Sequence, residues 1–382
     1  MAIGKRSAPS SQGACLRGCR SKGDGETVMI AVWTLVVVVV AALIATGAWR
    51  WTFAPFRIPV RKMTVAELGL TVPTEHVERI DSVLAAFAGG FNAMIAAPAV
   101  TTWQNYCRQL PSLCRPFAQE GAAMGYTVRQ LFRFDARAFE HTIVNQHPGF
   151  RYLHYVGVGF WSGMRHHDPQ KLHQVTAHLD PLYRYLSYDG YGFKHGFFDY
   201  PQDHAGLAPL DRLDGYARHA AYQGVGRALF FYHMGSSDTL IAHINGLGEY
   251  ALDAAGGIGL ASVFIFHDRL DVALDLATRW PEAWHPEVHL GMCFGLKARA
   301  INDPDQFVRD VQSQPRAVQQ AIHASLEQCD RVEARLRADR APDGYQRWRT
   351  QVRDWMTEHI EYPLAAFQQA GARTPQPEAA IT

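Results

Sequence analysis

The sequence carries almost no excess charge of either sign. Its 37 Lys and Arg residues are balanced by 36 Asp and Glu residues, which leaves a formal net charge of +1. A nucleic-acid-binding face needs Lys and Arg gathered together, and the sequence contains no such run. We therefore expect no nucleic-acid partner.

The short motifs of common metal and cofactor enzymes are also missing. The sequence contains no HExxH, Walker A or GxSxG motif. Gly157-Val158-Gly159 matches only the beginning of a GxGxxG motif, and no strand pattern precedes it. The sequence thus predicts no cofactor.

Histidines are concentrated in one stretch, which contains His166, His167, His173 and His178, together with Asp168. His173 and His178 are five residues apart, whereas two metal ligands on one helix face are four apart. We therefore predict no metal site here.

Cysteines are few and scattered, with no CxxC pair among the six. This absence excludes zinc ribbons and thioredoxin-like motifs. Cys107 and Cys114 are close enough in sequence to be bridged in an oxidising compartment, or both are free thiols. The spacing leaves both alternatives open.

One long apolar segment covers residues 29–49 without a single charged side chain. As a helix rising 1.5 Å per residue it would be about 30 Å long, the thickness of a bilayer core. A cleaved signal peptide has a shorter apolar core of ~7–15 residues. We predict an uncleaved single-pass anchor. Basic residues lie on both sides of it, so the positive-inside rule gives little orientation, and we favour a cytoplasmic body.

Alternating strand patterns are absent, and a glycine-rich phrase instead returns at a nearly constant interval. The copies begin 36, 33, 34, 33 and 34 residues apart, at Gly121, Gly157, Gly190, Gly224, Gly257 and Gly291. A period near 34 predicts stacked helix pairs, as in tetratricopeptide repeats, although the full consensus of that repeat is not met. The predicted fold is all-α, a helix-pair repeat solenoid after one transmembrane helix.

The domain organisation follows from these patterns. We expect disordered tails at residues 1–28 and 369–382 and an anchor at residues 29–49. A repeat domain should cover residues 64–312, and C-terminal capping helices should cover residues 313–368. In the repeat from Gly257 to Trp280 we expect helices over 259–266 and 269–280. Asp303 should cap the next helix, with Pro304 at its first position.

The glycines have two interpretations. Small residues at the repeated positions flatten a helix face and let a neighbouring helix approach closely. Because Gly within a helix costs ~0.5–1 kcal/mol relative to Ala, such packing must compensate for several per repeat. The alternative is close approach of the backbone to a bound ligand in the central copy, Tyr188 to Gly196.

Asp189 is the main candidate for chemistry, and it too has two interpretations. Before a glycine-rich helix, its carboxylate would cap free N–H groups and complement the helix dipole. Inside an aromatic cavity, desolvation would instead raise its pKa and make it a general acid or base.

Other candidates lie at similar phases of neighbouring repeats, which a solenoid places on one surface. As acid–base partners of Asp189 we predict Glu120, His154 and His195. For substrate binding we predict an aromatic and cationic wall made of Tyr183, Tyr188, Tyr191, Phe193, Trp161, Arg165, Arg227 and His233. We also expect the Asp189 carboxylate and the His154 imidazole to open on a common cavity.

Five ordered phrases between about residues 60 and 312 resemble a bacterial family of unknown function. They begin at Glu120 (EGAAM), His154 (HYVGVG), Leu179 (LDPLY), Asp189 (DGYGF) and Gly224 (GVGRALF). The resemblance implies specialised-metabolite biosynthesis, because that family is noticed beside enediyne-type polyketide clusters and in other natural-product loci. It also implies that the anchor lies in a bacterial inner membrane.

Two functions are compatible with these features. The first is a membrane-anchored enzyme that cyclises or isomerises a hydrophobic polyene, polyketide or isoprenoid by acid–base chemistry. The aromatic faces would stabilise positive charge. The second is a non-catalytic scaffold that holds a partner biosynthetic enzyme on its concave surface. A narrow apolar cavity favours the enzyme, and a wide polar groove favours the scaffold.

Overall fold

The computed structural model describes residues 22–97, 99–130, 133–165, 168–201 and 203–360 of the chain. All regular structure in these ranges is helical and none of it is strand, which confirms the all-α prediction for this part of the chain. The chain divides into two compact units, with the boundary between Thr52 and Phe53.

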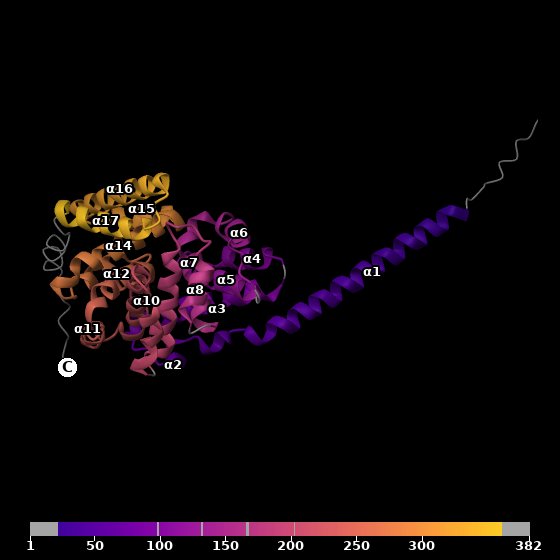
Figure 1. Cartoon of the computed structure of the whole chain (residues 1–382), viewed down its shortest axis with the longest axis horizontal. Helices are drawn as coiled ribbons and strands as arrows, with labels where there is room; N and C mark the ends of the chain where they lie inside the picture. Colours follow the sequence, from indigo (N-terminus) through magenta and orange to yellow (C-terminus); the bar gives the residue numbers. More distant parts are fainter. Residues whose placement is uncertain (1–21, 98, 131–132, 166–167, 202, 361–382) are drawn as a thin grey trace, which may run out of the picture. The chain divides into compact units, whose positions relative to one another are not determined.

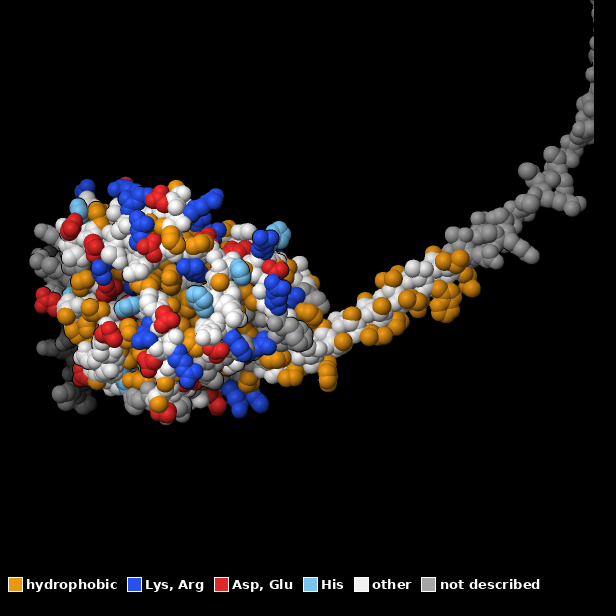
Figure 2. All heavy atoms as spheres, in the orientation of Figure 1, with side chains coloured by type: hydrophobic (Ala, Val, Ile, Leu, Met, Phe, Trp, Pro, Cys, Tyr) orange, Lys and Arg blue, Asp and Glu red, His pale blue; other side chains and the backbone are white. Residues whose placement is uncertain are grey.

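The first unit consists of the helix α1 (Lys22–Phe53) up to its penultimate residue. Apolar side chains cover the described surface of this helix, from Met29 onward, and almost all of them are exposed (Figure 2). The helix is long and apolar enough to cross a membrane, and either an anchor or a signal sequence has these properties. Residues 22–28, predicted as part of a disordered tail, belong to α1 instead. Residues 1–21 and 369–382 lie outside the described ranges.

Long and short helices alternate in the second unit (Figure 1). The long helices are α3 (Val77–Ala96), α5 (Arg115–Arg129), α7 (Arg151–Arg165), α9 (Tyr185–Lys194), α10 (Tyr216–His233), α12 (Ala251–Ile265) and α14 (His285–Asn302). The short helices between them are α4 (Thr101–Gln109), α6 (Ala136–Phe139), α8 (Pro169–Thr176), α11 (Ser237–Asn245), α13 (Leu270–Ala277) and α15 (Pro304–Gln312). Between α9 and α10 the place of a short helix is taken by a π-helix and a 3₁₀ segment, η6 (His195–Asp199) and η7 (His204–Arg212).

Each long helix packs against the next one along the chain, and the recurring glycines lie at these contacts. A Cβ at the first glycine of each copy would come closer than 3.0 Å to the backbone of the preceding long helix. These glycines are Gly121, Gly157, Gly190, Gly224, Gly257 and Gly291. Two residues later, a second glycine meets the following long helix in the same way in four copies, at Gly159, Gly192, Gly226 and Gly259. The packing interpretation of the glycines is therefore confirmed.

The stack of long helices is joined across its open side by contacts that are distant in sequence. The Arg79 guanidinium on α3 pairs with Asp268 at 2.6 Å and donates to the Ile265 carbonyl at the end of α12. Thr71 exchanges backbone hydrogen bonds with the end of α10, through the Tyr232 carbonyl and the Gly235 N–H group. The first and later long helices therefore face one another around a common interior.

Two C-terminal helices, α16 (Arg316–Asp339) and α17 (Gly344–His359), pack on each other and on α14 (Figure 1). Their positions match the two capping helices expected from the sequence. They also reach across the stack, because Tyr345 of α17 stacks on Tyr185 of α9, and Trp348 packs against Tyr152 of α7. The pair thus covers the interior of the stack as well as its end.

Of the local helix predictions, the cap at Asp303 is confirmed and the start of one helix was wrong. Asp303 caps α15 as expected, because its carboxylate accepts from the Gln306 N–H group and Pro304 opens the helix. The prediction of a helix over 259–266 was wrong about its beginning, since α12 starts at Ala251. Its glycines lie within the helix because close packing outweighs their low helix propensity.

The glycine contacts predict a strong asymmetry between two Gly→Ala variants. At Gly226 the added methyl group would clash with the backbone of Ala254, so Gly226→Ala should lower the free energy of unfolding by roughly 2 kcal/mol. At Gly149 the nearest atoms are 3.4 Å away, so Gly149→Ala should be neutral or slightly stabilising. Chemical denaturation of the full chain in detergent tests this, and equal midpoints for the two variants would contradict the packing role.

Candidate functional site

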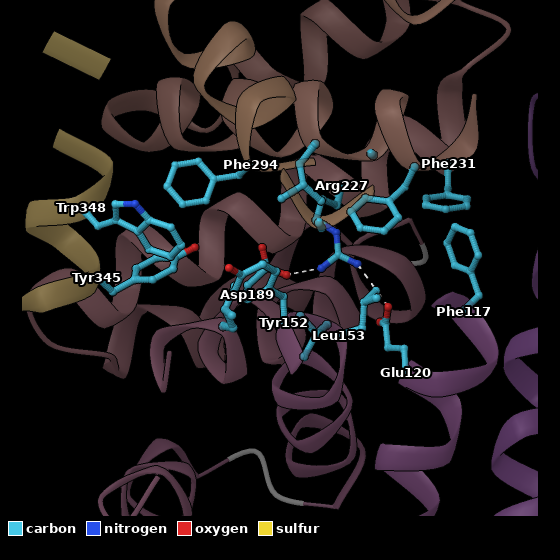
Figure 3. Close-up of a pocket in the computed structure, with 16 residues that line it drawn as sticks. Phe117, Glu120, Tyr152, Leu153, Asp189, Arg227, Phe231, Phe294, Tyr345 and Trp348 are labelled. Carbon is cyan, nitrogen blue, oxygen red and sulfur yellow. Dashed lines mark hydrogen bonds and ion pairs between the residues drawn. The ribbon is translucent and has the colours of Figure 1, made fainter. Parts of the chain in front are cut away.

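The interior of the stack contains a narrow cavity, with about 40 Å³ of room for the centre of a water-sized sphere. Most of its wall is aromatic and aliphatic, with Phe117, Phe231, Phe264 and Phe294 among the lining residues. On the side of α17 the wall is formed by Tyr345 and Trp348 (Figure 3). An apolar wall with a few converging polar groups is typical of sites for small organic ligands.

Most of the cavity wall is made by one stripe of each long helix from α5 to α14. In α5, α7 and α9 the lining residues lie four and one positions before the first glycine of the copy, as Phe117 and Glu120 do before Gly121. In α10, α12 and α14 they lie three and seven positions after it, as Arg227 and Phe231 do after Gly224. These spacings of three and four residues belong to one helix face. The glycines fix which face turns inward.

Three charged side chains open on this apolar space, and they form one cluster, the Glu120–Arg227–Asp189 cluster (Figure 3). The Arg227 guanidinium donates to the Asp189 carboxylate and lies 3.7 Å from the nearer oxygen of Glu120. All three residues are at most 6% exposed. An unpaired buried charge is costly. Because the three charges of this cluster are paired with one another, they are tolerated in an apolar interior.

A second layer of polar residues holds Asp189 in place. Gln223 on α10 donates to the second Asp189 oxygen at 2.8 Å. The Gln223 amide oxygen in turn accepts a hydrogen bond from Arg349 on α17, which also lies 3.3 Å from Glu287 on α14. Asp189 therefore has both oxygens engaged and is fixed by three different helices.

Burial and charge affect the three groups of the cluster differently. Burial raises the pKa of Glu120 to about 7, and Asp189 adds to this rise while Arg227 opposes it. Burial also raises the pKa of Asp189, against the opposing effect of Arg227 and the Gln223 hydrogen bond. Burial acts to lower the pKa of Arg227, but the two carboxylates more than offset it and keep the guanidinium charged. Glu120 is thus poised to exchange a proton near neutral pH.

The two alternatives for Asp189 are decided in part by this geometry. Asp189 is the fifth residue of α9, and its carboxylate contacts side chains of α10 rather than free N–H groups. The capping interpretation was wrong because α9 begins before the glycine-rich phrase. Asp189 does line an aromatic cavity, as the alternative required, and burial raises its pKa as it does that of Glu120.

The predicted histidines do not join the cluster. His154 is fully buried and its Nε2 lies 3.0 Å from the Gln119 amide oxygen, away from the cavity lining. Burial lowers the pKa of His154 to about 3, so it stays neutral. His195 lies in η6 with its Nδ1 2.6 Å from Asp199. The expectation that His154 and Asp189 share a cavity was therefore wrong, because their side chains leave α7 and α9 on different faces.

The predicted binding residues are divided among several places. Arg227 lines the cavity, and Phe193 stacks on its guanidinium, 5.0 Å from the ring centre. Tyr188 bonds to Thr176 and His173, Tyr191 packs on His195, and His233 stacks on His243. Tyr183 bonds to Glu333 and Arg337 of α16. None of these last four lines the central cavity.

A phenylalanine-rich outer pocket adjoins the central cavity. Both share the side chains of Phe117, Glu120, Arg227 and Phe231. From there the outer pocket continues along Phe87, Phe160, Phe193, Phe197 and Phe198 to Met63. The Glu120–Arg227 pair therefore stands between two apolar spaces.

Trp161 and Arg165 line a separate polar pocket, together with Arg133, Lys171 and His178. This pocket shares no lining residue with the central cavity. The sequence phases placed Trp161 and Arg165 with Asp189, but both lie beyond the inward face, toward the end of α7.

Neither metal ligation nor a disulfide is seen in the described part of the chain. No group of three or more His, Cys, Asp or Glu side chains there is arranged to hold a metal ion. Asp168 caps α8, where it accepts from the Gln170 N–H group, and His166 and His167 lie outside the described residues. Cys107 and Cys114 are buried free thiols.

Several lining residues were not predicted from the sequence, above all Tyr152, Phe294, Tyr345 and Trp348. Phe294 could have been found, because it lies three residues after Gly291, as Arg227 does after Gly224. Tyr345 and Trp348 carry no such signal, since α17 lies outside the repeated phrase.

The raised pKa of Glu120 predicts a pH-dependent stability. Between the unfolded value of 4.5 and the folded value of about 7, the folded chain binds more protons, so stability falls as pH rises through this window. The Glu120→Gln side chain has no proton to lose. This variant should therefore keep up to about 3 kcal/mol of the free energy of unfolding that the wild type loses as pH rises. Denaturation of both proteins between pH 4.5 and 8 measures the difference. The exposed Glu249→Gln variant should follow the wild-type curve, and parallel curves for Glu120→Gln would contradict the prediction.

Comparison with known proteins identifies one match. A family model described as "Protein of unknown function (DUF1702)" matches residues 53–356. No curated protein and no solved structure matches the chain. The match extends beyond the residues 60–312 expected from the five phrases, and it includes every residue that lines the central cavity. The link of such proteins to biosynthetic clusters stays a prediction. The chain belongs to the DUF1702 family of proteins of unknown function.

Proposed function

We propose that the protein is a membrane-anchored enzyme of bacterial specialised metabolism that isomerises or cyclises a hydrophobic substrate in the central cavity. The observation that carries this proposal is the Glu120–Arg227–Asp189 cluster, which opens on an otherwise apolar, aromatic space. Charged groups are costly in such a place, and perturbed carboxyl groups in a cavity are typical of catalytic sites.

The cluster favours chemistry in which negative charge develops. Glu120 as a carboxylate would take a proton from a carbon next to a carbonyl group, which leaves an enolate beside the Arg227 cation. Returning the proton to another carbon isomerises the substrate and restores the Glu120 carboxylate. In a ring closure, the enolate carbon would instead attack a second carbonyl carbon of the substrate. The oxygen of that carbonyl group then takes the proton from Glu120, which again restores the carboxylate. A carbocation would be repelled by Arg227. Among the polyene, polyketide and isoprenoid classes, the polyketide therefore fits best, because it carries carbonyl groups.

Access to the cavity is compatible with a lipophilic substrate. The outer pocket leads from Met63 through phenylalanine side chains to Glu120 and Arg227. Met63 follows the end of α1 by ten residues, so this route begins close in sequence to the apolar helix. An apolar molecule in the outer pocket would thus meet phenylalanine side chains beside the Glu120–Arg227–Asp189 cluster.

The helix α1 supports an uncleaved single-pass anchor in the inner membrane, with the second unit in the cytoplasm. Its exposed apolar side chains require a nonaqueous environment. Because basic residues lie on both sides of the apolar segment, the positive-inside rule gives little orientation here. The free thiols of Cys107 and Cys114 suit a reducing compartment.

A scaffold that binds a partner enzyme is the second candidate, and the concave side of the stack would be its docking surface. That side is occupied by Tyr345 and Trp348 of α17, which leaves a narrow apolar cavity. This supports the enzyme over the scaffold, and partner proteins would then bind elsewhere if at all.

Metabolite profiling of the native host tests the enzyme proposal. Host strains would produce the wild type, Glu120→Gln or Asp189→Asn, with protein levels in the membrane fraction checked by immunoblot. Removing a general acid or base typically costs 10²–10⁴-fold in rate, so Glu120→Gln should reduce a lipophilic product at least about a hundredfold. Asp189→Asn should also reduce it, since Arg227 loses its charged partner.

The matched control for that experiment is Glu249→Gln, which removes an exposed carboxylate away from the cavity and should leave the profile unchanged. An unchanged profile for both cavity variants at normal protein levels would contradict the enzyme proposal. It would favour the scaffold, which co-purification of a partner with the cavity variants would then support.

The anchor is tested by following the mass of the full chain in cells. An uncleaved anchor keeps the 42.7 kDa chain in the membrane fraction after a carbonate wash. Val37→Lys with Val40→Lys should release it, because each charge at a span centre costs about 2.5–3.5 kcal/mol on the insertion scale. A shortened chain in the soluble fraction would instead identify α1 as a cleaved signal sequence.

A further inference from the structure

The described residues that line the polar pocket beside α7 include several basic side chains. It contains about 1180 Å³ of space including its open mouth, between the ends of α5 and α7 and the helix α8. Arg133, Arg165 and Lys171 line it with His178, and none of the described lining residues is an Asp or Glu. In a chain with 37 basic and 36 acidic residues, this local excess does not follow from composition.

The nearest acidic residues in sequence are committed to helix caps. Asp135 accepts from the N–H groups of Arg137 and Ala138 at the start of α6. Asp168, three residues from both Arg165 and Lys171, accepts from the Gln170 N–H group at the start of α8. Their carboxylates are therefore directed to backbone donors, and within the described ranges neither Arg133 nor Lys171 forms an ion pair with a carboxylate.

We propose that this basic pocket binds a phosphate group. Like charges that converge on one hollow repel one another, and a bound anion removes that repulsion. Arginine forks match the oxygen geometry of phosphate and form paired hydrogen bonds with it, while lysine adds a point charge. The site is distinct from the central cavity and does not depend on the function proposed for it.

The walls of the basic pocket suggest where the phosphate comes from. The rings of Phe134 and Trp161 supply apolar surface beside the cations. Phe56, three residues after the end of α1, packs edge-on against Trp161 with the ring centres 5.9 Å apart. A phosphate carried by a lipid headgroup would satisfy both the cations and the aromatic wall, whereas free phosphate would use the cations alone.

Titration calorimetry on the full chain in a neutral detergent tests the site. The probes are dioctanoyl phosphatidic acid, inorganic phosphate, and dioctanoyl glycerol, which has the same chains without the phosphate. Tighter binding of the phosphatidic acid than of inorganic phosphate would support the site with a lipid source. Equal binding of the two would support it with a soluble source. Binding of dioctanoyl glycerol as tight as that of the phosphatidic acid would overturn the proposal, as would no binding of either phosphate.

Charge-removing variants locate the binding. Arg133→Gln with Lys171→Gln should weaken phosphate binding at least tenfold and reduce its salt dependence, because both side chains are exposed lining residues with no packing role. Arg137→Gln with Arg316→Gln removes the same charge from exposed positions outside the pocket and should change the affinity less than twofold. Equal losses in the two double variants would overturn the assignment to this pocket.

Discussion

Close contact between helix backbones is the constraint on which the rest of this structure depends. Each long helix presents a glycine to the helix before it, and in four copies a second glycine meets the helix after it, so neighbouring backbones touch without an intervening side chain. This contact fixes how each helix is rotated. The rotation turns one stripe of each long helix from α5 to α14 inward, and those stripes carry most of the aromatic wall and the charges of the cavity.

The Glu120–Arg227–Asp189 cluster is stable in that interior because each charge has a partner supplied by a different helix. Arg227 on α10 meets Asp189 on α9 and Glu120 on α5, while α17 contributes Arg349 through Gln223. Asp189 has more hydrogen bonds than Glu120, so the two carboxyl groups are unequal. Unequal environments are what separate a fixed counterion from a group that exchanges protons near neutral pH.

Two sites of opposite character are arranged around one stack. The central cavity is apolar with a buried charged cluster, and the pocket beside α7 is open and basic. An apolar molecule would suit the central cavity, and a phosphate group would suit the basic pocket. Both lie within residues 53–356, the part of the chain that the family shares, whereas the apolar helix α1 precedes it.

The sequence by itself determined the all-α class, the apolar helix and the cap at Asp303, because each of these depends on local spacing or on side-chain type. It left two interpretations of the glycines, and the contacts between helices decided for packing. It also identified Glu120, Asp189 and Arg227. It did not place His154 or Tyr188 correctly. A small rotation of a helix about its axis is enough to turn side chains at similar positions of two repeats in different directions. Only the tertiary structure decided that Asp189, inside α9, pairs with Arg227 of α10 rather than capping a helix. It also decided that Tyr345 and Trp348 enclose the cavity, because these contacts join segments that no local pattern relates.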